Sequence, residues 1–180
     1  MVKTYSENIK SNFDGTIIDL ETIGNFRDGY SDSRRCTDII PVIFGYINKA
    51  GIKIFCCENK ESFAELKRKT KLILPKLKKP FYAFNSDFER SVLFYFLGEP
   101  VAFHGELNRE KYEPKWRVVQ SLNIPNYDDP FYDNSMDCML AWYAGEIDKS
   151  ISHNRSCLLK ERDILLMRGF RKPDNLKLIL

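Results

Sequence analysis

The chain has 180 residues, of which 43% are hydrophobic and 13% aromatic, and its formal net charge at pH 7 is +3. This length and apolar content suit one compact core, so we expect residues 1–180 to form a single domain. No run of about 18 apolar residues is present, and the first stretch, "MVKTYSENIKSNFDG", is too polar for a secretory signal. These features argue against a membrane partner and predict a cytoplasmic protein.

The cysteines give no sign of a disulfide framework or a structural zinc site. They are odd in number and include no C-x-x-C pair. We therefore expect reduced and mostly buried thiols at Cys36, Cys56, Cys57, Cys138 and Cys157.

The first half of the chain is rich in strand patterns. "TIIDLET" (16–22) is short and β-branched, which favours a strand. "DIIPVIFGYINKAGIKIFCCEN" (38–59) predicts two strands joined at "NKAG", an antiparallel hairpin. The pattern Ser62-x-x-Glu65 then suggests a capping box at the start of a helix, which Pro75 should end.

The second half alternates towards helices. "PFYAF" (80–84) predicts a strand that leads into a helix over "SDFERSVLFYFLG" (86–98). Residues 101–134 look mainly like loop, with a helix around 113–122, and helices are expected over 134–145 and 152–170. Antiparallel strands followed by alternation with helices predict an α/β fold, a mixed sheet of antiparallel hairpin and parallel strands flanked by helices.

Two carboxylates stand one residue apart on the first of these strands. Side chains at i and i+2 of a strand share a face, so Asp19 and Glu21 should project together. Their mutual repulsion is costly unless a cation compensates, and a hard divalent ion with oxygen ligands does so directly. The alternative is that one acid is exposed at the strand end and the other caps a turn.

A second acidic feature lies at the junction of strand and helix. Asn85, Phe88, Glu89 and Leu93 follow the spacing N-x-x-F-E-x-x-x-L, and the helix macrodipole favours a carboxylate near this helix start. The alternative is that Asp87 and Glu89 are ordinary helix-start acids.

Together these motifs resemble those of a known enzyme family. "IIDLET" looks like the first motif of the DEDD superfamily of 3′–5′ exonucleases, which have a ribonuclease H-like fold. "FNSDFERSVL" is similar to the second motif, whose register places the acid at Glu89, with Glu where most members have Asp. "NSMDCMLA" (134–141) resembles the stretch that often precedes the third motif.

The third motif departs from the family pattern. Members end with H-x-x-x-x-D, or with Y-x-x-x-D, on a late helix. His153 matches the histidine, but Cys157 and Leu158 stand where the acid is expected. Glu161, one helical turn beyond Cys157, is our replacement ligand, and Asp163 is the second choice. Alternatively, "KERD" only forms the solvated face of the helix and His153 has no chemical role.

The resemblance implies a two-metal phosphodiester hydrolase. Asp19, Glu21, Glu89 and Glu161 would bind two Mg²⁺ or Mn²⁺ ions, one to activate water and one to stabilise the leaving 3′ oxygen. His153, neutral near pH 7, would act as the general base.

The same resemblance implies a substrate. We expect Thr22, Asn85 and Phe88 to contact the 3′ end of single-stranded DNA or RNA. The basic segments 66–80 and 168–177 could hold phosphates, and exposed aromatic residues could stack on bases. Alternatively, these segments are a solvated helix face and a loose tail. Three functions stay open: an exonuclease, an inactive nucleic-acid-binding module of the same fold, and a nuclease that cuts internally or trims RNA ends.

Overall fold

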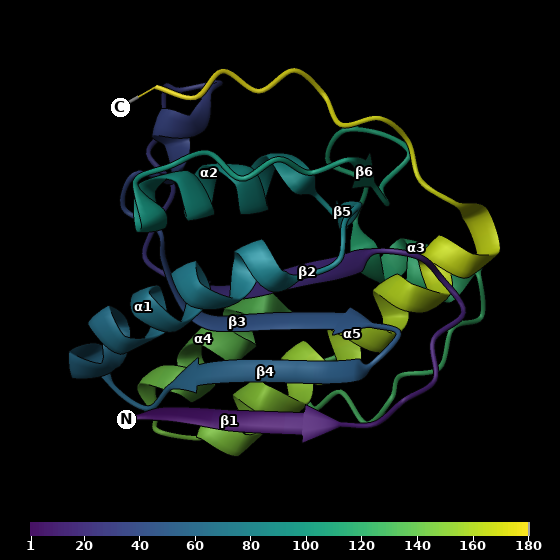
Figure 1. Ribbon diagram of the computed structural model, residues 1–180, viewed down its shortest axis with the longest axis horizontal. Helices are drawn as coiled ribbons and strands as arrows, with labels where there is room; N and C mark the ends of the chain where they lie inside the picture. Colours follow the sequence, from purple (N-terminus) through teal and green to yellow (C-terminus); the bar gives the residue numbers. More distant parts are fainter. Residues whose placement is uncertain (180) are drawn as a thin grey trace.

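A six-stranded mixed sheet forms the centre of the computed structural model, which describes residues 1–179 (Figure 1). The strand order is β1-β4-β3-β2-β5-β6. β2 runs antiparallel to β3 and parallel to β5, so the sheet joins an antiparallel hairpin to parallel strands. The predicted ribonuclease H-like fold class is confirmed. The strands are β1 (Val2–Glu7), β2 (Thr16–Ile23), β3 (Ile40–Asn48), β4 (Gly51–Cys57), β5 (Phe81–Ala83) and β6 (Gly105–Glu106).

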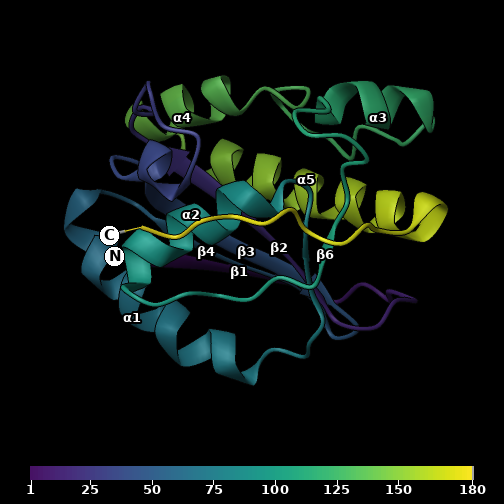
Figure 2. The ribbon, with the colours of Figure 1, turned by 90° about the horizontal axis from the view of Figure 1, so that it is seen from above.

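Helices cover both faces of this sheet. α1 lies on one face, and α4 and α5 lie on the other, while α2 packs beside β2 and β5 (Figure 2). Within residues 1–179, no helix has the length and apolar character needed to cross a membrane. The helices are α1 (Phe63–Ile73), α2 (Ser86–Leu97), α3 (Lys115–Ser121), α4 (Ser135–Tyr143) and α5 (Ile147–Arg168).

The central strand β2 is buried along most of its length. Ile17 and Ile18 are fully buried, as expected for a β-branched strand with helices on both faces. Across the ladder, Asp19 faces Gly45 of β3. A Cβ at Gly45 would lie 1.9 Å from Oδ1 of Asn154, so the missing side chain lets α5 approach the sheet closely. This close approach brings the acids of β2 against α5.

The N-terminal strand β1 was not predicted, because its sequence is mostly polar and contains no apolar run. It pairs antiparallel with the edge of β4. The helix-start residues of α1 bind this strand instead of capping their own helix. Ser62 Oγ accepts a hydrogen bond from the Met1 amino group (2.8 Å), and Glu65 Oε2 accepts one from the Val2 N–H (3.1 Å). The capping-box interpretation is therefore wrong.

The ends of α1 and α2 lie close to the proline and glycine that the sequence pattern indicated. α2 ends at Gly98, whose φ of 81° is the left-handed conformation that glycine adopts freely. α1 gives way to a 3₁₀ turn at Leu74–Lys76, which contains Pro75. Two differences remain: the short strand β6 lies in the segment predicted as loop, and α5 begins at Ile147 instead of near residue 152.

Candidate metal centre

Four carboxylates from three elements meet beside β2, and we call them the acidic cluster. Asp19 and Glu21 project from β2, Glu89 from α2 and Glu161 from α5. All four are buried, with exposed fractions of 6%, 5%, 4% and 0% in that order. Burial raises the pKa of Glu89 well above its ordinary value, and the nearby charges of Asp19 and Glu161 raise it further. The structure thus brings together the four residues expected to hold metal ions.

The cluster is short of positive charge and of hydrogen-bond donors. Burial raises the pKa of Glu161 well above its usual range. Burial also raises the pKa of Glu21, to about 7, although the nearby His153 acts to lower it. Glu89 Oε2 and Glu161 Oε2 are buried and accept no hydrogen bond from residues 1–179. Buried oxygens without donors are costly. Carboxylate oxygens are the ligands that Mg²⁺ and Mn²⁺ prefer, so these side chains have the chemistry to hold such ions.

A lysine that the sequence did not reveal reaches into the acidic cluster. Lys115, at the start of α3, places Nζ 2.7 Å from Glu161 Oε1 and 3.5 Å from Asp19 Oδ1. Burial opposes its charge, but Asp19, Cys157 and Glu161 raise the pKa of Lys115 well above its ordinary value. Its side chain remains 20% exposed. Lys115 therefore supplies a positive charge at the place where a divalent cation would be held.

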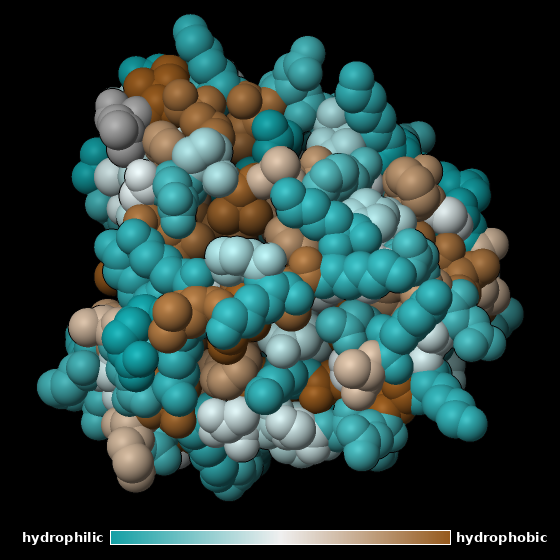
Figure 3. All heavy atoms as spheres, in the orientation of Figure 1, coloured by the Kyte–Doolittle hydropathy of each residue, from teal (hydrophilic) through white to brown (hydrophobic). Residues whose placement is uncertain are grey.

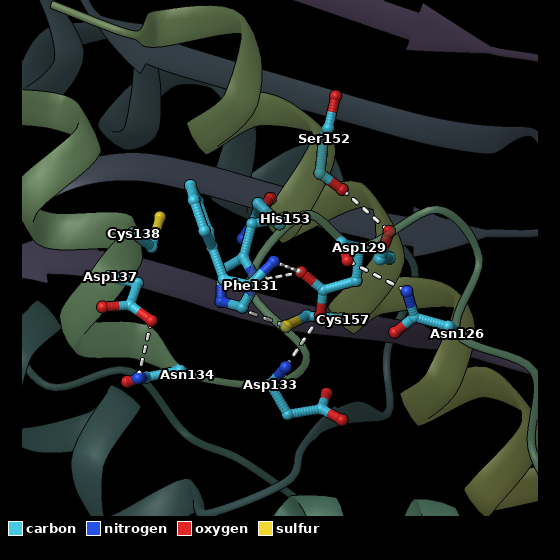
Figure 4. Close-up of polar contacts among 12 residues, drawn as sticks. Asn126, Asp129, Phe131, Asp133, Asn134, Asp137, Cys138, Ser152, His153 and Cys157 are labelled. Carbon is cyan, nitrogen blue, oxygen red and sulfur yellow. Dashed lines mark hydrogen bonds and ion pairs between the residues drawn. The ribbon is translucent and has the colours of Figure 1, made fainter.

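His153 is held by a buried aspartate, Asp129 (Figure 4). Its Nδ1 is 2.7 Å from Asp129 Oδ1, and its Nε2 is 3.7 Å from Glu21 Oε1. Burial alone would lower the pKa of His153, but Cys157, Glu21 and Asp129 together raise it to about 12. In the metal-free chain this arrangement favours the imidazolium, whereas the general base expected from the sequence would be neutral near pH 7.

Asp129 organises the loop that approaches His153. One oxygen accepts the backbone N–H of Phe131 (3.0 Å) and the other that of Asp133 (2.9 Å). Lys160 donates to the same carboxylate at 2.8 Å and is fully buried.

The stretch "KERD" (160–163) does not form a solvated helix face over its first two residues. Lys160 and Glu161 are both fully buried, so this alternative is wrong for them.

The acids that compete with the chosen ligands point elsewhere. Asp163 accepts hydrogen bonds from Tyr127 and from the neighbouring Arg162. Asp137 accepts one from Asn134 Nδ2 (2.8 Å) at the exposed start of α4 (Figure 4). On α2, Asp87 faces Arg90 at 3.4 Å. Because Asp87, Asp137 and Asp163 have these partners, Glu89 and Glu161 are the helix residues that complete the acidic cluster.

The residues expected to contact substrate line hollows next to the cluster. One hollow of about 160 Å³ lies against the acidic cluster and is bordered by Asn85, Phe88 and Lys115. A second, of about 310 Å³, adjoins it and includes Thr22 and Phe88. A third, which also includes Asn85 and Phe88, is lined by Phe26, Arg35, Lys111 and Tyr112.

The two basic segments, 66–80 and 168–177, contribute no basic residue to the lining of these three hollows. α1 lies on the sheet face opposite α5, where Figure 3 shows a mostly hydrophilic surface. In the C-terminal segment, Arg168 pairs with Glu113 (2.8 Å) and Arg171 with Asp174 (2.8 Å). Besides Lys115, the basic residues Lys111 and Arg35, which the sequence did not single out, line the third hollow.

Comparison with known proteins gives no relative: no protein-family model matches the chain, and no curated protein or solved structure matches it significantly.

Proposed function

We propose that the chain is a divalent-metal-dependent 3′–5′ exonuclease that hydrolyses phosphodiester bonds at the ends of single-stranded nucleic acid. The observation that carries this proposal is the convergence of Asp19, Glu21, Glu89 and Glu161 from β2, α2 and α5. Two of the four buried carboxylates, Glu89 and Glu161, have an oxygen without a donor within residues 1–179. A cation would compensate these oxygens, and a surface that only binds nucleic acid has no use for them.

The acidic cluster would hold the ions. Two Mg²⁺ or Mn²⁺ ions bound there would activate water and stabilise the leaving 3′ oxygen. Asn154 Nδ2 donates to Asp19 Oδ2 at 2.6 Å and fixes the direction of that carboxylate. Lys115 has to leave its present partners, Glu161 and Asp19, when the ions bind, because its ammonium competes for the same oxygens.

The surrounding hollows would hold the strand end. Phe88 lines all three hollows and offers an apolar wall close to the cluster, while Asn85 offers an amide. Phe26 is 47% exposed and Tyr112 is 70% exposed, so both can stack on bases without regard to sequence. Lys111 lines the same hollow as these two aromatic residues and can meet a phosphate.

His153 has a supporting role in this account. It is 1% exposed and does not border the hollow against the acidic cluster. Its Nε2 faces Glu21, and its Nδ1 is fixed by Asp129. His153 therefore orients and partly neutralises Glu21 and does not itself contact the substrate.

The proposal is tested with single-stranded DNA and RNA carrying a free or a blocked 3′ end, incubated with Mn²⁺. The wild type should shorten the free-ended strands stepwise and spare the blocked ones, and Asp19→Ala and Glu89→Ala should lose this activity. Equal activity in all three proteins would contradict the assignment. Internal cuts in the blocked strand would instead indicate an endonuclease.

One observation favours a second candidate, an inactive nucleic-acid-binding module. Lys115 already supplies a cation to the acidic cluster, as a protein without metal would need. This module would bind single strands equally well with and without Mn²⁺, and its affinity would not change in Asp19→Ala. Mn²⁺ binding measured by calorimetry distinguishes the two candidates.

A further inference from the structure

A second group of possible ligands shares Glu21 with the acidic cluster and extends from it to α5. It consists of Glu21 on β2 and of His153 and Cys157, one turn apart on α5. Their ligand atoms all lie within 4.8 Å of one another, and all three residues are buried. This group joins a carboxylate oxygen, an imidazole nitrogen and a thiol sulfur, whereas the acidic cluster offers oxygen alone.

We propose that Glu21, His153 and Cys157 form a Zn²⁺ site that links β2 to α5. Zn²⁺ takes oxygen, nitrogen and sulfur ligands, whereas Mg²⁺ and Mn²⁺ favour oxygen, so the sulfur of Cys157 selects the softer ion. The proposal goes beyond the nuclease assignment and does not depend on it, because the ion can bind whether or not the chain cleaves nucleic acid.

The spacing of the ligand atoms fits this ion. Cys157 Sγ is 3.7 Å from His153 Nε2, and His153 Nε2 is 3.7 Å from Glu21 Oε1. Tetrahedral coordination with Zn–S of about 2.3 Å and Zn–N of about 2.0–2.1 Å separates sulfur and nitrogen by about 3.6 Å. The three side chains thus need little rearrangement to surround the ion.

Asp129, on the other side of the His153 imidazole, also supports the proposed Zn²⁺ site. Asp129 Oδ1 lies 2.7 Å from Nδ1 of His153, which leaves Nε2 directed at Cys157 (Figure 4). The same Nε2 is 3.7 Å from Glu21 Oε1. A carboxylate that holds the other ring nitrogen is the usual companion of a histidine bound to zinc, since it fixes the ring and strengthens the ligand. Asp129 is 2% exposed and is itself held by Lys160, so the ring has little freedom to turn.

The ion has a path to this place. Glu21 borders the hollow against the acidic cluster and also the adjoining hollow lined by Thr22 and Met139. Three protein ligands leave a fourth coordination position for water, as in zinc sites that remain open. Binding releases the proton of the Cys157 thiol and the proton on Nε2 of His153, because both atoms must offer a lone pair to the metal.

Cobalt tests the proposal directly, because Co²⁺ replaces Zn²⁺ and reports thiolate ligands by its absorption. The full chain is stripped with EDTA, desalted and titrated with Co²⁺. We expect one equivalent to bind with a thiolate-to-cobalt charge-transfer band, and Zn²⁺ to abolish that band by competition. A wild-type chain that binds no Co²⁺, or binds it without the band, overturns the proposal.

Two variants of one residue and a matched control assign the sulfur. Cys157→Ser should lose the band, whereas Cys57→Ser, which alters another buried thiol at the end of β4, should keep it. If Cys157→Ser does not fold by circular dichroism, Cys157→Asp keeps an oxygen ligand in place and should bind Co²⁺ without the band. Persistence of the band in a folded Cys157 variant contradicts the proposal.

A final variant separates this site from the nuclease assignment. Glu89→Gln removes a carboxylate of the acidic cluster but none of the three proposed zinc ligands. The charge-transfer band should survive in Glu89→Gln even though Mn²⁺-dependent cleavage is lost. If the wild type shows the band but no cleavage, the zinc site stands and the proposed function fails.

Discussion

Replacing Lys115 with methionine should weaken the metal-free protein and strengthen its binding of divalent cations. Methionine keeps much of the length of the lysine stem but removes the ammonium. That ammonium is 2.7 Å from Glu161 Oε1 and 3.5 Å from Asp19 Oδ1, and the Glu161 side chain is completely buried. The substitution therefore leaves a buried carboxylate without its main positive partner.

The magnitude follows from the burial of the two partners. Breaking a buried ion pair by removing one side costs about 3–5 kcal/mol. We expect the lower end, about 3 kcal/mol, because Lys115 is 20% exposed and Glu161 can take up a proton. For a chain of this length, that loss lowers Tm by roughly 6–12 °C.

The gain in cation affinity has the same origin. In the wild type, Mn²⁺ has to displace the ammonium of Lys115 from the acidic cluster, whereas in Lys115→Met it does not. Since about 1.4 kcal/mol corresponds to a tenfold change in affinity, we expect Kd for Mn²⁺ to fall by about 10–100-fold. Added Mn²⁺ should then raise Tm more in the variant than in the wild type.

Scanning calorimetry with and without Mn²⁺, together with isothermal titration, measures both effects. Lys111→Met is the matched control, because Lys111 is an exposed lysine four residues earlier. It should change neither quantity. If Lys115→Met matches the wild type in Tm and in Mn²⁺ affinity, the ammonium does not occupy the cation position and the reasoning is refuted.

Three further substitutions have defined outcomes. Gly45→Ala should cost about 1–3 kcal/mol in urea unfolding and weaken Mn²⁺ binding, because its Cβ would meet Asn154 Oδ1 at 1.9 Å; an unchanged midpoint would contradict this packing. Asp163→Asn should leave Mn²⁺ affinity at the wild-type value by titration calorimetry, since that carboxylate binds outside the acidic cluster. Arg155→Gln should lower the free energy of unfolding by about 1 kcal/mol at pH 7. The hydrogen bonds from Arg155 lower the pKa of Glu7, so this stabilisation is present above pH 4.5 and lost as pH falls through the lowered pKa; an equal loss at pH 7 and pH 3 would refute it.

Strands and helices with strong local patterns were predictable. β2, the β3–β4 hairpin and α2 have β-branched runs or helical spacing that match their buried faces. β1 was missed because an edge strand with exposed polar residues has little apolar alternation. β6 is too short for a local signal, since it spans only Gly105–Glu106.

Strand spacing placed Asp19 and Glu21 together, whereas the motif resemblance led to the choice of Glu89 and of an acid on the last helix. Asp19 and Glu21 share a strand face, and Glu89 is set by the register of its helix motif. Glu161 follows from helical geometry, because it lies one turn beyond Cys157 and on the same face of α5. The local period of a strand or helix fixes the face on which each of these side chains lies, once the residue has been chosen.

The remaining members of the site could not be predicted in this way. Lys115 and Asp129 come from residues 101–134, which lack helical or strand periodicity over most of their length. Each reaches its partners through tertiary packing, since Lys115 and Glu161 are 46 positions apart in the sequence and Asp129 and His153 are 24 positions apart. The proximity of Cys157 to Glu21 depends likewise on α5 packing against β2.

The most direct test of the central claim compares two acids on one helix. A 5′-labelled single strand is incubated with Mn²⁺ and the wild type, Glu161→Gln or Asp163→Asn, and the products are resolved by length. We predict a ladder that shortens from the 3′ end with the wild type and with Asp163→Asn, and intact substrate with Glu161→Gln. A ladder that persists in Glu161→Gln, or is absent from the wild type, would contradict the claim that the acidic cluster is a nuclease centre.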